Sequence, residues 1–213
     1  MSQLLSAHSI TFHYPGSADL HLPDLELGAA GQALLLGSSG SGKTTYLHLI
    51  AGLLRPHSGK LMIDGTDIYS LGERQLDAFR GQNIGIVFQV PHFLRALSVT
   101  ENIAMAQRLA GKEPDLYRID ELLAELGLSA KRDRKIHHLS QGEKQRVSII
   151  RALINKPRLI LADEPTSALD DKNCASVIRM LKEQAIAQGS ALLVVTHDHR
   201  LSKEFDQKIQ LSS

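Results

Sequence analysis

Short hydrophobic runs recur along the chain, and each one ends at a polar or glycine-rich break. They occupy residues 33–37 (ALLLG), 84–88 (IGIVF), 158–163 (RLILAD) and 191–196 (ALLVVT). Because most of their consecutive positions are apolar, both faces of each predicted strand should be covered, as in the central strands of a parallel sheet between helices. The pattern therefore predicts an α/β fold with a parallel central sheet.

Two other patterns flank these runs. The residues up to about 30 alternate more between apolar and polar positions, as does the segment 60–65 (KLMIDG) with its Asp-Gly turn, which favours antiparallel strands. Between 99 and 154 the hydrophobic spacing becomes helical. We therefore predict one domain over 1–213, in which a core with an antiparallel β flank (1–89 and 155–213) carries an inserted helical subdomain (90–154).

A glycine-rich segment follows the first of the hydrophobic runs. Residues 37–44 (GSSGSGKT) match the G-x-x-x-x-G-K-[ST] pattern of a P-loop NTPase core, between a predicted strand and a helix-like segment. Inward-facing backbone N–H groups and the positive helix end would bind the phosphates. Lys43 should bridge the β- and γ-phosphates, and the Thr44 hydroxyl should hold Mg²⁺. The alternative is a flexible glycine turn, which the strand-loop-helix setting argues against.

The candidate ATP-binding residues of this loop are Gly37, Ser38, Ser39, Gly40, Ser41, Gly42, Lys43, Thr44 and Thr45.

Two adjacent carboxylates, Asp163 and Glu164, end the third hydrophobic run. Phosphoryl transfer requires a metal anchor and a group that orients the attacking water. We assign Asp163 to Mg²⁺, through water, and Glu164 to general-base catalysis. Taken alone, two acids at a strand end would be ordinary helix caps or loop residues. The phosphate loop is what favours the catalytic interpretation.

Gln89 and His197 each follow the end of a predicted central strand. Their side chains should therefore lie at the carboxyl edge of the parallel sheet, where α/β proteins bind ligands. Each residue by itself is also compatible with a structural hydrogen-bonding role.

The segment 137–146 (HHLSQGEKQR) has the pattern of a helix start. Ser140 can cap the helix while Glu143 reaches back to the Ser140 amide, which makes an S-x-x-E capping box. Gly142 lies inside that first turn, where glycine costs about 1 kcal/mol relative to alanine. Because free backbone amides at a helix start suit an anion, we expect this helix start to bind one.

Taken in order, GSSGSGKTT, VFQ, LSQGE, LILADEPTSALD and VVTHD resemble the motifs of the ATP-binding cassette (ABC) family. The resemblance extends from Tyr14 to Asp198. It implies an ATPase whose two cassettes lie head to tail around two ATP molecules. In such a dimer, Ser140 and the Gly142 amide would touch the γ-phosphate held by the second copy.

The same resemblance implies further roles. Tyr14 would stack on adenine, Asp170 would cross the dimer interface and His197 would sense the γ-phosphate. Gln89 corresponds to the family's glutamine loop, with a role in catalysis and in Mg²⁺ binding.

The signature segment departs from the common L-S-G-G-Q at Gln141 and Glu143, which remain candidate ATP-binding residues. The contacts implied for Ser140 and the Gly142 amide do not use the side chain at 141. We therefore expect activity to be retained, with the Glu143 carboxylate turned back onto its own helix by the capping box.

Composition limits the partners. Lys and Arg number 24 against 23 Asp and Glu, and the net charge of +1 gives no field that would attract nucleic acid. A single cysteine, Cys174, excludes an internal disulfide and fits a reducing compartment.

The longest apolar run, 191–195, is far shorter than the ~18 residues of a membrane span. We expect a cytoplasmic chain, held on the inner face of the cell membrane by a partner.

The run 83–105 (NIGIVFQVPHFLRALSVTENIAM) is similar to bacterial lipoprotein-releasing, macrolide-exporting and cell-division ABC ATPases. This implies a homodimer that drives an integral membrane permease subunit. Two alternatives stay open: a non-transport cassette acting as a mechanical or signalling switch on a membrane partner, and a P-loop kinase or nucleotide-binding adaptor. A P-loop kinase or nucleotide-binding adaptor would not need the segments LSQGE and SALD.

Phe93 and Leu94 are the candidate residues for contact with this partner. A groove at these residues would receive a short helix of the membrane subunit. The alternative is that both side chains pack inside the helical subdomain.

Overall fold

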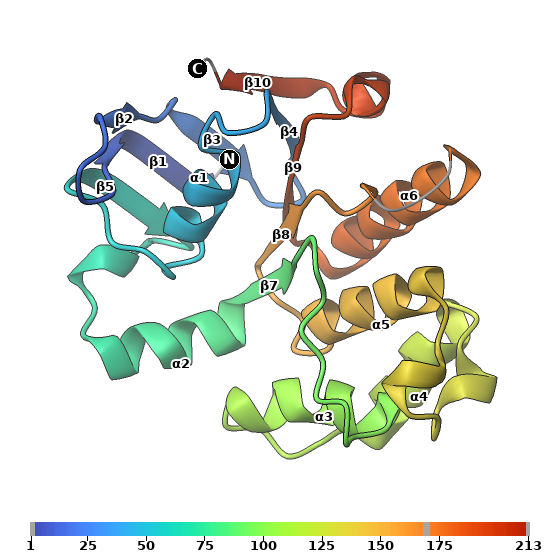
Figure 1. Ribbon diagram of the computed structural model, residues 1–213. Coiled ribbons are helices and arrows are strands. Elements are labelled where there is room, and N and C mark those ends of the chain that lie inside the picture. Colours follow the sequence, from blue (N-terminus) through green and yellow to red (C-terminus); the bar gives the residue numbers. More distant parts are fainter. Residues whose placement is uncertain (1–2, 168–170, 212–213) are drawn as a thin grey trace.

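The computed structural model describes residues 3–167 and 171–211. Within these ranges the chain forms two five-stranded sheets, one antiparallel and one parallel, together with helices (Figure 1). Asp170, expected at the dimer interface, lies outside the described residues.

The parallel sheet forms the centre of the molecule, with strand order β10-β4-β9-β8-β7. Its strands are β4 (Gln32–Gly37), β7 (Ile84–Val87), β8 (Leu159–Asp163), β9 (Ala191–Thr196) and β10 (Gln207–Leu211). The first four coincide with the predicted hydrophobic runs and confirm them. β10 was not predicted, because as an edge strand it leaves most of its side chains outside the core.

The second sheet is antiparallel and confirms the predicted flank. It contains β1 (Gln3–Phe12), β2 (Leu20–His21), β3 (Leu25–Gly28), β5 (Ser58–Ile63) and β6 (Thr66–Asp67). Between β5 and β6, Asp64 and Gly65 make the two-residue turn with positive φ angles of 48° and 76°. Such a turn matches the twist of the strands that it joins.

The helices are α1 (Lys43–Ile50), α2 (Glu73–Asn83), α3 (Val99–Leu109), α4 (Leu116–Glu125), α5 (Gln141–Leu153) and α6 (Asp171–Gln188). Short 3₁₀ turns are η1 (Ile68–Ser70), η2 (Ser129–Lys131), η3 (Ile136–His138) and η4 (His199–Lys203). In Figure 1, α3, α4 and α5 lie together at the lower right, away from the antiparallel sheet. They confirm the helical pattern of 99–154, whereas the boundaries of a separate subdomain at 90–154 stay a prediction.

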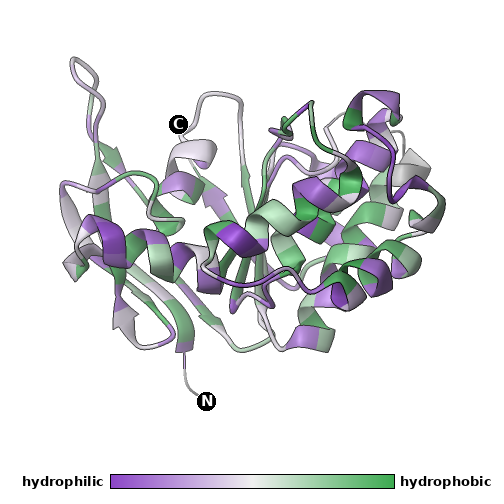
Figure 2. Cartoon of the chain, turned by 90° about the horizontal axis from the view of Figure 1, so that it is seen from below, coloured by the Kyte–Doolittle hydropathy of each residue, from purple (hydrophilic) through white to green (hydrophobic). Residues whose placement is uncertain are grey.

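Side chains that alternate along the central strands divide the core into two clusters. Leu34 and Leu36 of β4 join a cluster with α3, α4, α5 and α6, whereas Ala33 and Leu35 join one with α1 and the antiparallel sheet. β8 and β9 alternate in the same way. Figure 2 shows hydrophobic residues following the strands, while the helices alternate between hydrophilic and hydrophobic segments. Burial on both faces explains the uninterrupted apolar runs.

None of the helices that the structure describes combines the length and the hydropathy needed to cross a lipid bilayer.

Candidate active site

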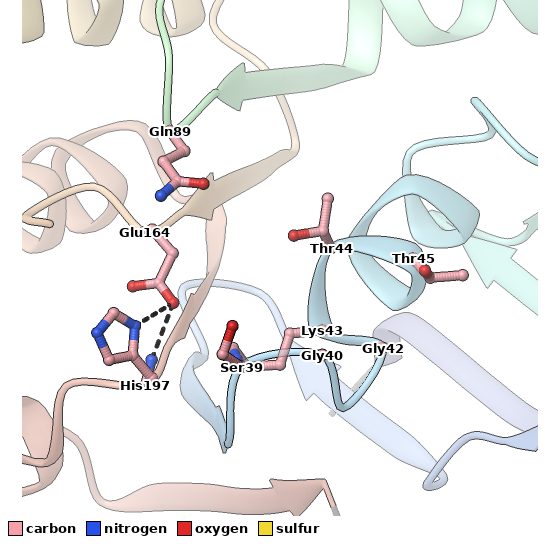
Figure 3. Close-up of a pocket in the computed structure, with 9 residues that line it drawn as sticks. All are labelled: Ser39, Gly40, Gly42, Lys43, Thr44, Thr45, Gln89, Glu164 and His197. Atoms are coloured by element: carbon pink, nitrogen blue, oxygen red, sulfur yellow. Dashed lines mark hydrogen bonds and ion pairs between the residues drawn. The ribbon is translucent and has the colours of Figure 1, made fainter. Parts of the chain in front are cut away.

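A pocket of about 380 Å³ lies where the strands of the parallel sheet end. In Figure 3 the glycine-rich loop and the first turn of α1 face Gln89, Glu164 and His197 across it. The residues that line it are Ser39, Gly40, Gly42, Lys43, Thr44, Thr45, Gln89, Glu164 and His197. The fold thus brings four predicted motifs, separated by up to 158 residues between Ser39 and His197, into one pocket.

The glycines give the loop its shape. Gly40 and Gly42 have φ angles of 83° and 94°, which side-chain-bearing residues rarely adopt. A Cβ atom on Gly37 would lie 2.5 Å from the Ser41 hydroxyl oxygen. Since no side chain caps the start of α1, its first backbone N–H groups are available to an anion.

Lys43 is 7% exposed and turns back onto the loop. Its ammonium group donates hydrogen bonds to the carbonyl oxygens of Gly37 (2.9 Å) and Ser38 (2.7 Å). A buried ammonium needs such acceptors, and an ammonium has three N–H donors to offer. The lysine is therefore held in place at the pocket with a donor left for an anion.

Thr44, which lines the pocket, and Asp163, which does not, place two oxygen atoms side by side at its edge. The Thr44 hydroxyl donates to Asp163 Oδ2 at 3.0 Å. Among the described residues, the buried Oδ1 of Asp163 has no hydrogen-bond partner. Burial raises the pKa of Asp163 and the charge of Glu164 adds to this, while the Thr44 bond opposes it.

These oxygens suit Mg²⁺, which prefers oxygen ligands and retains waters and substrate phosphates. The part of the chain that the structure describes has no group of three or more His, Cys, Asp or Glu side chains for a metal ion.

Glu164 is fixed more firmly than the sequence suggests. Its carboxylate is 8% exposed and accepts bonds from the His197 amide (3.0 Å), from His197 Nδ1 (2.7 Å) and from the Thr196 hydroxyl (2.7 Å). The first two appear in Figure 3. Thr196 was missed as a partner, although it directly precedes His197 in VVTHD.

The backbone of Glu164 is also unusual. Its φ of 45° lies in the left-handed region, which is uncommon for a residue with a side chain and clusters at functional sites. A 2.8 Å bond from the Glu164 amide to the Val195 carbonyl ties this residue to β9. Backbone and side chain together hold the carboxylate at the pocket.

Tyr14 lies beside the loop without lining the pocket. It is 45% exposed, and its hydroxyl is 3.2 Å from the Thr45 hydroxyl. Ser38 and Ser41 likewise shape the loop without lining the pocket.

The predicted capping box is present at the start of α5. The Glu143 amide donates to the Ser140 hydroxyl (3.3 Å), and the Ser140 amide donates to the Glu143 carboxylate (2.7 Å). Lys131 Nζ lies 3.0 Å from the same carboxylate. The carboxylate thus turns back onto its own helix, as expected. Ser140, Gln141, Gly142 and Glu143 do not line the pocket of their own chain.

These bonds give Glu143 a testable pH dependence. The Ser140 amide, followed by Lys131, lowers the pKa of Glu143 from 4.5 to about 2. Because the folded-state pKa is the lower one, its stabilisation is complete above the unfolded value and is lost as pH falls toward 2. We expect the unfolding free-energy difference between wild type and Glu143→Gln to shrink between about pH 5 and about pH 3.

Urea unfolding at several pH values measures this difference. Glu113→Gln, an exposed carboxylate in the loop before α4, is the control for the same charge change. A difference for Glu143→Gln that does not change with pH would contradict the bonded geometry.

A second, more apolar pocket of about 640 Å³ lies between α2, β7, α3 and α5. Leu94 lines it and is 53% exposed. Phe93 does not line it. Its ring packs against the helical part of the core, with the Arg151 guanidinium 4.9 Å from the ring centre. Phe93 thus packs as the alternative expected, and the contact of this segment with a membrane partner stays a prediction.

The residues lining this groove also include Leu53, Ile84, Phe88, Met105, Ala106, Leu109 and Asn155. Sequence reasoning missed these residues because they come from separate segments that only the folded chain brings together.

Comparison with known proteins identifies related chains. A family model described as ABC transporter matches residues 20–167. The lipoprotein-releasing system ATP-binding protein LolD of Shewanella frigidimarina is 40% identical over 190 residues, which cover 88% of this chain and 80% of that protein. LolD of Shewanella oneidensis is 38% identical over 192 residues, covering 89% and 84%.

Solved structures of ABC cassettes are also similar to this chain. The dimeric structure of MJ0796, a bacterial ABC transporter cassette, has a TM-score of 0.88 and 31% identity, covering 98% of this chain and 94% of that one. A post-hydrolysis dimer of the same cassette bound to ADP and Pi has a TM-score of 0.85 and 30% identity, covering 97% and 94%.

Proposed function

The chain belongs to the ABC transporter family and is an ATPase of that family, and on this basis we propose that it powers a membrane complex that releases lipoproteins. The observation that carries the proposal is its similarity, over most of its length, to lipoprotein-releasing ATP-binding proteins. The pocket at the sheet edge supplies the residues for ATP hydrolysis.

In this proposal the glycine-rich loop and Lys43 bind the phosphates of ATP, and Tyr14 stacks on the adenine. Bound Mg²⁺ would neutralise charge on the phosphate oxygens. Thr44 and Asp163 would hold it, with Gln89 on the opposite side of the pocket. Support comes from the unpartnered buried oxygen of Asp163, next to the Thr44 hydroxyl.

Glu164 acts as the general base in this scheme. Thr196 and the His197 amide orient its carboxylate, so that it can take a proton from the attacking water. The His197 ring is 60% exposed, and it can therefore turn from Glu164 toward the γ-phosphate.

A second copy of the chain completes each site. Ser140 and the Gly142 amide contact the γ-phosphate held by the partner's loop. Ser140 and Gln141 support this role because they are exposed at a helix start, outside their own pocket. The dimeric state of the related cassette structures supports it as well.

The apolar groove is the proposed binding site for the permease. A short amphipathic helix would fit between α2 and α3, with its apolar face on Leu53, Leu94 and Leu109. This contact would place the cassette in the cytoplasm, peripheral to the inner face of the membrane. No nucleic-acid partner is part of the proposal.

We expect Leu94→Asp to lose its membrane partner while basal ATPase stays within a few-fold of wild type. An aspartate at 94 would place a hydrated carboxylate where the permease helix presents apolar side chains, which opposes docking, and Leu94 is not part of the ATP pocket. Co-purification from detergent-solubilised membranes measures the contact. Tyr117→Asp, at an 80% exposed residue outside the groove, is the matched control. A Leu94→Asp chain that still retains the permease would contradict the docking site.

The function itself is tested by reconstitution. The chain is purified from membranes with its partner, the partner is identified, and the complex is placed in proteoliposomes. Stimulation of ATPase by a lipoprotein, with release of that lipoprotein to an acceptor, supports the proposal. A partner without cargo-dependent stimulation would contradict it in favour of a mechanical switch.

A further inference from the structure

Four rings form a continuous cluster at the edge of the antiparallel sheet, beside the ATP pocket. Tyr14 packs edge-on against Phe12, with ring centres 4.9 Å apart and planes at 88°. Phe12 is 5.9 Å from His57. His57 in turn stacks on His13, with centres 3.7 Å apart and planes at 16°. A chain of ring contacts therefore connects the two histidines to Tyr14.

Hydrogen bonds fix the histidine pair. The His57 amide donates to the Thr11 carbonyl at 2.9 Å, which anchors His57 to β1. His57 Nδ1 accepts a bond from the His13 amide at 3.4 Å, which only an unprotonated nitrogen can do. His13 Nδ1 lies 3.1 Å from the Asp19 carboxylate. This geometry needs a neutral His57 ring.

The position of Tyr14 depends on this pair, since Tyr14 directly follows His13. The Tyr14 amide donates to the Ser17 hydroxyl at 3.0 Å, and the Ser17 amide donates to the Tyr14 carbonyl at 3.0 Å, which closes a tight turn. The Tyr14 hydroxyl then reaches Thr45, a residue that lines the ATP pocket, at 3.2 Å. The turn thus begins at Tyr14, directly after His13, and the Tyr14 side chain ends against the nucleotide site.

We propose that His13 and His57 are positioning residues that hold Tyr14 for the adenine base, and that ATP affinity falls when both rings are charged. The proposal rests on the proposed ATP site. Two imidazolium rings stacked at 3.7 Å repel each other, and a protonated His57 Nδ1 can no longer accept from the His13 amide. Histidine is the side chain whose charge ordinarily changes between pH 5 and pH 8.

The surroundings of the pair contain few other charges. The Asp19 carboxylate lies against His13, the Tyr14 phenol follows His13 in sequence, and the Arg55 guanidinium, two residues before His57, donates to the carbonyls of Tyr69 and Leu71. Phe12 on β1 and Ser58 on β5 carry no charge.

The test measures the dissociation constant of ATP by calorimetry between pH 7.5 and pH 5.5. We expect affinity to fall by about fivefold more in wild type than in His57→Phe, the size given by two unit charges 4 Å apart in water. Phenylalanine keeps the stack, lacks the acceptor for the His13 amide at every pH and cannot be charged, so the pH profiles and not the absolute affinities are compared. The ratio between the two proteins at each pH cancels the protonation of ATP itself. His13→Phe should behave in the same way, and it serves as a second variant should His57→Phe fail to fold.

His8→Phe is the matched control. His8 lies on β1 of the same sheet, but its ring contacts Asp24 and Glu26. It should keep the wild-type profile.

The variant Tyr14→Ala distinguishes a failure of the positioning role from a failure of the proposed adenine contact. Adding His57→Phe to Tyr14→Ala should leave the pH profile unchanged, because the pair acts through Tyr14. Weakened binding in Tyr14→Ala, with identical profiles in wild type and His57→Phe, would overturn the positioning role alone. Unchanged binding in Tyr14→Ala would overturn the adenine contact and the positioning role together.

Discussion

Glu164→Gln should bind Mg-ATP about as tightly as wild type and hydrolyse it ~10²–10⁴-fold more slowly. Glutamine keeps the length of the side chain and an oxygen that can accept from the His197 amide, so the pocket retains its shape. It cannot take a proton from water, which is the role assigned to the carboxylate. The phosphate-binding loop is untouched by the change. The variant should therefore stop after binding, as an ATP-trapped dimer.

Size-exclusion chromatography with Mg-ATP detects this trapped dimer. Lys43→Ala is the matched comparison, because it removes the ammonium from the phosphate loop and should lose most ATP binding. It should therefore elute as a monomer. Wild-type turnover by Glu164→Gln would contradict the general-base assignment.

The central sheet was predictable for a physical reason. β8 and β9 are buried on both faces, so their hydrophobic runs are uninterrupted and stand out in the sequence. α2 gives no such signal, because Leu76 is its one buried residue within the described chain. A helix or strand that buries few side chains leaves little hydrophobic pattern in the sequence.

Whether a site residue was predicted depended on whether its partners are close to it in the sequence. The glycine loop was found because its chemistry is local: the glycines, Lys43 and Thr44 are neighbours in sequence. The Thr196 bond to Glu164 depends on β8 and β9 lying side by side, and so it appears only in the fold. Phe93 and Leu94 make the same point, since adjacent apolar residues face a core and a groove.

The largest effect expected outside the pocket is that of Ser140→Arg. The serine caps α5, and losing it should cost about 1 kcal/mol of stability, which leaves the chain folded. Arginine also fills the exposed helix start that we assign to the partner's γ-phosphate. In a two-fold dimer every site uses one Ser140, so the variant should lose both sites. Vanadate trapping of Mg-nucleotide should fall to background, whereas folding, followed by circular dichroism, should persist.

The central claim is that each site combines Lys43 of one chain with Ser140 of the other, and a mixed dimer tests it most directly. Lys43→Ala and Ser140→Arg are made as two differently tagged chains, and dimers that carry both tags are confirmed by tandem purification. In a mixed dimer one site collects both changes, while the other keeps a native lysine and a native serine. Each mixed dimer keeps one native site of two, so the purified mixed dimers should recover about half of wild-type vanadate trapping, although neither variant traps nucleotide alone. Trapping that stays at background in confirmed mixed dimers would contradict the account and leave Ser140 as a helix cap only.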